Sequence, residues 1–156
     1  MKKMIVIALT FVISACATSY QKDGFTGGYE ETWMSSDIVK VDFAGNGYTS
    51  STRTADFSML RVAELAIEKG YPYFELLNQS SDSTTHTTPV QHNVSRVGNQ
   101  VYVDQTGGHT FTKPSSSNLA KFYMEKPAVA IGVIYESKFI CNSIKAKHDL
   151  KEVSCM

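Results

Sequence analysis

Residues 51–69 read STRTADFSMLRVAELAIEK and carry the clearest helical pattern of this chain. Ser51 or Thr52 suits the N-cap, and Gly70 stands where many helices end. On a helical wheel, the main apolar stripe falls within an arc of about 160°. Its members are Met59, Leu60, Val62, Ala63, Ala66 and Ile67. Such a stripe is typical of a helix that packs on a sheet.

Two apolar residues of this helix, Phe57 and Leu65, lie outside the stripe. Either another segment covers them or they belong to a surface that binds a partner. The charged residues Arg61, Glu64 and Glu68 cluster on the side opposite the stripe, with Arg61 and Glu64 at i,i+3 spacing. We expect this cluster to be a solvent-exposed face rather than a site for acid or base chemistry.

Strands are expected on both sides of the helix. Alternating residues at 29–33 and 39–43 predict two strands before it, and residues 73–78 predict a third directly after it. The strand, helix and strand over 37–78 are long enough for a parallel crossover, and an antiparallel arrangement is the alternative.

The middle of the chain predicts a hairpin between polar loops. Residues 79–88 and 112–118 are polar, which predicts loops, the first of them mobile. Gly98-Asn99 is a two-residue hairpin signal between strands at 90–97 and 100–105. In that register Val94 faces Val103 and His92 faces Gln105.

The last third predicts two strands and a helix. Residues 119–124 form a strand, and residues 129–135 are apolar on both faces, which is typical of a central strand. Ser137 is the expected cap of a short helix to about Lys147, and Lys145, Lys147 and His148 suit its C-terminal end.

These elements together predict one fold class. Residues 28–156 form a single α+β domain with a mixed or mostly antiparallel sheet, one long amphipathic helix on one face and a short C-terminal helix.

The N-terminus has the three parts of an export signal. Lys2 and Lys3 precede an apolar run that covers only about half of a membrane's hydrocarbon core. The run ends in small residues and a cysteine, at Ile13, Ser14, Ala15 and Cys16. This ending resembles the lipobox of bacterial lipoproteins, in which a peptidase cuts before the cysteine and the thiol carries diacylglycerol. An ordinary signal peptide is the alternative.

The resemblance to a lipobox implies an address and an anchor. Residues 1–15 would be removed, and Cys16 would hold the protein to the membrane through two or three acyl chains, such as palmitate. Ala17 follows the cysteine in place of an aspartate, which in enteric-type bacteria indicates the outer membrane, facing the periplasm. Residues 16–27 are then expected to form the lipidated N-terminus and a flexible tether.

The net charge of the chain indicates which classes of partner it can bind. Removal of residues 1–15 leaves 13 basic and 15 acidic residues, a net charge of −2, so nucleic acid is not an expected partner.

Cys141 and Cys155 are the cysteines that remain after Cys16, and an even number in an exported chain predicts a disulfide between them. Two free thiols are the alternative, and zinc is disfavoured because the set lacks a compact ligand pattern.

A family resemblance rests on four motifs. They are GYEE at 28–31, FAGNGYT at 43–49, LRVAEL at 60–65 and GYPYF at 70–74. This stretch resembles a family of small proteobacterial lipoproteins and covers about a third of the chain. The resemblance implies a one-domain envelope lipoprotein and carries over no catalytic residue.

Four common catalytic or nucleotide-binding motifs do not occur in the sequence. It lacks HExxH, GxSxG, GxxxxGK[ST] and GxGxxG, so no catalytic residue and no cofactor is assigned. His86, His92, His109 and His148 have no i,i+3 or i,i+4 spacing, and solvated histidines are expected rather than a metal site at His86 and His92. Asn46 is expected to serve a turn, by adopting the left-handed conformation, rather than to bind a ligand.

The sequence thus favours a non-enzymatic lipoprotein that acts by contact with a periplasmic or envelope protein. A second hypothesis is a module that binds a small ligand or a glycan, for which eight tyrosines and Trp33 could supply stacking surfaces. An envelope hydrolase is the weakest alternative. The first two hypotheses differ in whether the aromatic side chains line a concavity or fill the core.

Overall fold

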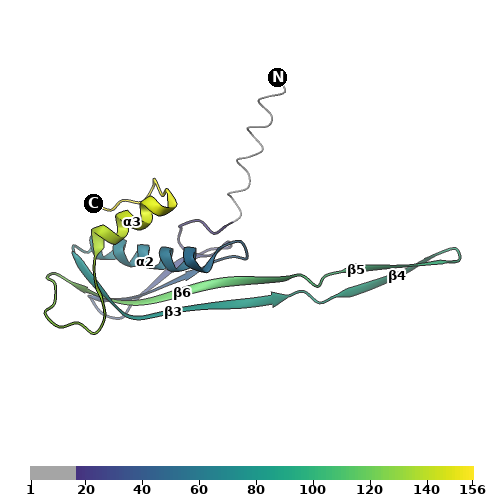
Figure 1. The fold of residues 1–156 in the computed structure, drawn as a ribbon, viewed down its shortest axis with the longest axis horizontal. Helices are drawn as coiled ribbons and strands as arrows, with labels where there is room; N and C mark the ends of the chain where they lie inside the picture. The colour runs from purple at the N-terminus through teal and green to yellow at the C-terminus, as the bar shows by residue number, and fades with distance from the viewer. Residues whose placement is uncertain (1–16) are drawn as a thin grey trace, which may run out of the picture.

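The computed structural model describes residues 17–156, and the predicted signal, lipobox and lipidation site at residues 1–16 lie outside the described residues. Along the chain the elements are β1 (Gly28–Trp33), β2 (Ile38–Ala44), α2 (Ser51–Glu68), β3 (Tyr73–Thr87), β4 (Gln91–Val97), β5 (Gln100–Thr106), β6 (Thr110–Tyr123), β7 (Ile134–Glu136) and α3 (Ser137–His148). They form a single α+β domain, as the sequence predicts (Figure 1).

The main sheet has the strand order β1-β2-β6-β3-β7, and each neighbouring pair is antiparallel. Strands β2 and β3 both pair antiparallel with β6, so they run parallel to each other with β6 between them. The connection through α2 is therefore a parallel crossover that skips one strand.

Helix α2 lies along one face of this sheet (Figure 1). Val39, Val41 and Phe43 of β2 alternate with less buried residues, and Ala120 and Phe122 of β6 are buried beside them. Burial of each of these valine and phenylalanine side chains contributes about 1.5–3 kcal/mol, so this layer between helix and sheet is the main core of the domain.

Phe57 and Leu65 are buried in this core, which confirms that another segment covers them. The ring of Phe57 contacts Phe43 below it, and Tyr20 and His148 from the two ends of the chain. The alternative, that these two residues form a partner surface, is wrong.

The N-terminal segment packs on the domain at Thr18 and Tyr20, so the flexible tether predicted for residues 16–27 is wrong at these two residues, whereas residues 21–26 are exposed. The Thr18 N–H donates to Thr49 Oγ1 at 2.8 Å, and the Asn46 N–H donates to Thr18 Oγ1 at 2.9 Å. Gly27 has a φ of +91°, and a Cβ there would lie 2.2 Å from the Ala44 oxygen, so only glycine fits where this segment meets β2. The polar composition of the N-terminal segment suggested a linker. In the structure, however, the polar groups of Thr18 bind Asn46 and Thr49 in the turn that precedes α2.

Strands β3 and β6 extend through the segments that composition predicted to be loops. Residues 79–87 pair with 110–118 as a continuous antiparallel ladder. The hydroxyls of Thr85 and Thr112 lie 3.3 Å apart across it. Serine and threonine occur in loops because they are polar, but threonine is β-branched and pairs well across strands, and here the partner strand decides.

Beyond this ladder the chain continues into the predicted hairpin of β4 and β5. Val94 pairs with Val103, and His92 pairs with Gln105, which confirms the expected register. Every residue of both strands is exposed. Figure 1 shows β4 and β5 as a narrow arm that projects past the end of α2.

The prediction of a central strand at residues 129–135 is wrong. Only Ile134–Glu136 form a strand, β7, and it lies at the edge of the sheet beside β3. Val129 and Ile131 are exposed in the connection before it. The carboxylate of Glu75 accepts the Gly132 N–H at 2.5 Å, which holds this connection in a bend rather than in a strand ladder.

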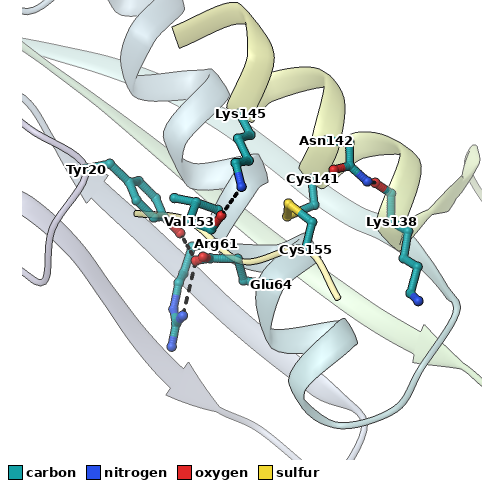
Figure 2. The surroundings of a disulfide bond; sticks show 9 residues. All are labelled: Tyr20, Arg61, Glu64, Lys138, Cys141, Asn142, Lys145, Val153 and Cys155. Carbon is teal, nitrogen blue, oxygen red and sulfur yellow. Dashed lines mark hydrogen bonds and ion pairs between the residues drawn. A yellow bond between two sulfur atoms is a disulfide. The ribbon is translucent and has the colours of Figure 1, made fainter. Parts of the chain in front are cut away.

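Helix α3 packs on α2 and carries the disulfide (Figures 1 and 2). Its N-cap is Glu136, and the Ser137 hydroxyl instead donates to the Tyr71 carbonyl at 3.0 Å, so the predicted cap is wrong by one residue. The predicted bridge between Cys141 and Cys155 is confirmed, with a Cα–Cα distance of 5.7 Å. Within residues 17–156, no helix combines the length and apolar character that a membrane span requires.

Candidate functional site

The surface of residues 17–156 contains an open groove of about 860 Å³. It lies between the loop at residues 25–26, the turn at 46–48 and residues 109–113, where β6 begins. Phe25, Tyr48 and Phe111 expose their rings in its walls. Aromatic rings with polar neighbours make such a groove a candidate binding site.

The turn on one side of the groove is organised by Asn46. Its Oδ1 atom accepts the Tyr48 N–H at 3.0 Å and the Thr49 hydroxyl at 3.0 Å. This confirms a structural role, but the expected mechanism is wrong, because Asn46 has a negative φ and acts through its side chain. The turn thereby displays Tyr48 outward.

The other side of the groove belongs to β6. The ring of His86 on β3 stacks on Phe111, with centroids 5.3 Å apart, and Lys113 Nζ lies 5.8 Å from the Phe111 centroid. Lys113 and His109 are among the lining residues, so the groove combines an aromatic wall with a cation and the imidazole of His109.

Most other aromatic side chains of the domain contribute to the core. Trp33 packs edge-on against Phe122 at 5.9 Å. Tyrosines that pack against the core are Tyr20, Tyr29, Tyr71 and Tyr135. They are not available to stack on a ligand, whereas Tyr48 and the two phenylalanines of the groove, Tyr102 on the arm and Phe139 on α3 are exposed.

The charged cluster on α2 is an ordered network, so the prediction of a solvent-exposed face is wrong for Arg61 and Glu64. The Arg61 side chain is 14% exposed and bonds Glu31 at 2.9 Å, Glu64 at 3.2 Å and Glu68 at 3.0 Å. Burial alone would lower the pKa of Arg61, but the hydrogen bond to Glu31 and the negative charges of Glu31 and Glu68 together raise it.

The same network reaches the N-terminal segment. The hydroxyl of Tyr20 donates to the Glu64 carboxylate (Figure 2). Burial, followed by the negative charge of Glu64, raises the pKa of Tyr20 above its ordinary value, so the hydroxyl keeps its proton. These partners satisfy the charges of the network, which joins β1, α2 and the N-terminal segment rather than forming a reactive centre.

Glu75 on β3 is a buried carboxylate that sequence analysis did not single out. It is 1% exposed, and the Tyr123 hydroxyl donates to it at 2.8 Å in addition to the Gly132 N–H. The bond from Gly132 and then that from Tyr123 lower the pKa of Glu75. Its signal in the sequence is a single glutamate within an apolar strand, YFELL.

The histidines do not converge. His148 Nε2 lies 2.7 Å from Asp56 Oδ2, beside Lys147 Nζ at the same distance, so it is packed rather than solvated as expected. His86 lies on β3, His92 on β4 and His109 in the connection before β6. Within residues 17–156, no group of three His, Cys, Asp or Glu residues could hold a metal ion.

The arm is the second candidate surface. One face of the hairpin carries Val94, Val101 and Val103, and all three side chains are at least half exposed. A second exposed apolar group, Val129, Ile131 and Val133, lies in the connection before β7. We call these the arm patch and the loop patch.

No protein-family model, no curated protein and no solved structure matches this chain. The resemblance to the lipoprotein family in four motifs stays a prediction. By its fold, the protein is a single α+β domain with a projecting β-hairpin.

Proposed function

We propose that this chain is a lipid-anchored protein of the bacterial envelope, held through Cys16 on the periplasmic side of the outer membrane, which acts without catalysis by binding another polypeptide. The anchor rests on the sequence from Ile13 to Cys16. The contact function rests on the exposed arm of β4 and β5.

The arm supports binding because it has no core of its own. All residues of β4 and β5 are exposed, and an isolated two-stranded hairpin is marginally stable in water. Three valines on one face carry apolar surface into solvent. A partner that covers the arm patch would remove this surface from water and would stabilise the hairpin.

A photo-crosslinking amino acid tests this function in intact envelopes. Placed at Val94 in the full chain, it should capture a polypeptide, whereas the matched control at the exposed Lys151 near the C-terminus should capture none. Capture at both positions, or at neither, would argue against the arm as the contact surface.

The groove supports a second function, the binding of an envelope glycan. Phe25, Tyr48 and Phe111 expose their rings beside Lys113 and several threonines, a combination that suits contact with a sugar and hydrogen bonds around it. Soluble peptidoglycan fragments should bind the full chain, and Tyr48→Ala should weaken the binding while Tyr102→Ala on the arm should not. Equal binding by both variants would leave the groove without this role.

A further inference from the structure

The outer edge of β3 is open along most of its length. Strand β7 pairs only with Tyr73, Phe74 and Glu75, whereas β3 continues to Thr87. Within residues 17–156, no strand pairs with this edge beyond Glu75, and β6 occupies the other edge. The backbone N–H and C=O groups on the open side can therefore pair with a further strand.

Beyond the register shift between Leu76 and Asn78, this edge has few of the features that prevent strands from pairing between molecules, and Asp82 is its one acidic residue. Residues 79–87 read QSSDSTTHT and contain no lysine and no proline. The neighbouring strand β6 has both, at Lys113 and Pro114, where it runs past the end of β2. Edge strands that must stay unpaired carry such residues, so the contrast singles out the edge of β3 as a pairing surface.

The charges of this edge are arranged symmetrically. Asp82 and His86 are its titratable residues, and each lies two positions from Thr84. If two copies pair antiparallel with a two-fold axis through Thr84, Asp82 of each lies opposite His86 of the other. An axis at Asp82 or at His86 would instead place like groups opposite each other. Lys113, the cross-strand partner of Thr84, adds positive charge on the same face of the sheet.

We propose that the polypeptide bound by this protein is a second copy of the same chain, paired antiparallel along residues 81–87 of β3 with Thr84 on the two-fold axis. This inference rests on the proposed contact function and names the partner. Seven residues of each copy form the new ladder, and it joins the two main sheets through their β3 strands.

The two exposed apolar patches fit this symmetry. The loop patch lies beside Leu76, because a Cβ built on Gly132 would be 3.1 Å from the Leu76 oxygen. At about 3.3 Å per residue, Leu76 is about 26 Å from Thr84 on one side, and Val94 lies at most about 33 Å away on the other, beyond the irregular residues 88–90. A two-fold axis at Thr84 therefore brings the loop patch of each copy alongside the arm patch of the other. Both patches would then leave water.

Cysteine crosslinking of the full chain in intact envelopes tests the axis. Cys141 and Cys155 are bridged to each other, so a cysteine introduced at Thr84 reports on its own neighbour. Thr84→Cys should form a covalent dimer with an oxidant or a short bismaleimide. Gln79→Cys is the matched control, because its two copies would be ten residues, about 33 Å, apart.

A charge exchange tests the register in the same background. His86→Asp places Asp82 opposite an acid and should lower the crosslinked fraction at Thr84→Cys several-fold. Adding Asp82→His restores opposite groups at both positions and should restore the dimer. These side chains are exposed, so unchanged thermal unfolding of the variants checks that the fold is retained.

Other outcomes overturn the proposal. They are a folded Thr84→Cys chain that stays monomeric, equal crosslinking at Gln79→Cys, no recovery in the exchanged variant, or an adduct at Thr84 that contains a different protein. The last result would leave the contact function standing, because capture at Val94 tests that function separately. Capture of nothing at Val94 would argue against the contact function whatever happens at Thr84.

Discussion

Glu75 on β3 and Gly132 before β7 are 57 residues apart in sequence, yet the Glu75 carboxylate accepts the Gly132 N–H at 2.5 Å. The bond places a buried negative charge under a loop whose apolar side chains point into solvent, with Ile131 93% exposed. The buried carboxylate of Glu75 thus holds the loop in a conformation in which its apolar side chains are exposed to solvent.

Glu75→Gln should destabilise the domain by about 1–3 kcal/mol at neutral pH, because hydrogen bonds to a charged group are replaced by weaker ones. The pKa of Glu75 is lowered in the folded state, so its contribution is present above the ordinary pKa of glutamate and is lost as the pH falls through the lowered value. The difference in unfolding free energy between wild type and variant should shrink on acidification. A difference that is constant from neutral to acidic pH would contradict this role.

Loss of the disulfide should destabilise the protein by about 3 kcal/mol, the value that chain entropy gives for a loop of about fifteen residues. Cys155→Ser and reduction of the wild type should lower the urea midpoint to a similar degree. Hydrogen exchange should rise first in α3 and the C-terminal segment that the bridge joins. The double variant Cys141→Ser/Cys155→Ser is the control, since a reductant should not affect it.

The N-terminal segment should depend on Tyr20 for its packing. Tyr20→Ala removes a ring that lies 5.3 Å from Phe57 and 5.2 Å from Tyr29, and should cost about 3–5 kcal/mol and expose residues 18–27 to protease. Tyr20→Phe keeps the ring, loses the bond to Glu64 and should cost only about 1 kcal/mol. Phe25→Ala, at an exposed position, is the control and should change neither measurement. Equal protease sensitivity of all three variants would show that the segment is free.

Cys16 should carry the lipid anchor. A clickable fatty acid fed to cells should label the wild type, and Cys16→Ser should be unlabelled and released from the membrane fraction. Cys141 and Cys155 are bridged, so they should take up no label and serve as an internal control. Equal labelling of wild type and Cys16→Ser would exclude the anchor.

Local patterns in the sequence predicted the elements that are encoded by residues close together in the chain. The period of α2, the alternation in β2 and the Gly98-Asn99 turn of the β4–β5 hairpin are encoded by neighbouring residues. The pairing of Cys141 with Cys155 follows from their number and their predicted compartment. The export signal and lipobox rest on sequence alone.

Tertiary structure decided the features that depend on distant residues. The polar run at 79–87 is a strand because β6 supplies its ladder, as where Thr85 meets Thr112 across 27 residues of sequence. Arg61 is ordered rather than solvated because Glu31 on β1 reaches it. The apolar segment after residue 128 is exposed because β6 occupies the middle of the sheet and Glu75 holds the bend at Gly132. A side chain's type sets which bonds it can make, but burial and pairing depend on which groups the rest of the chain brings beside it.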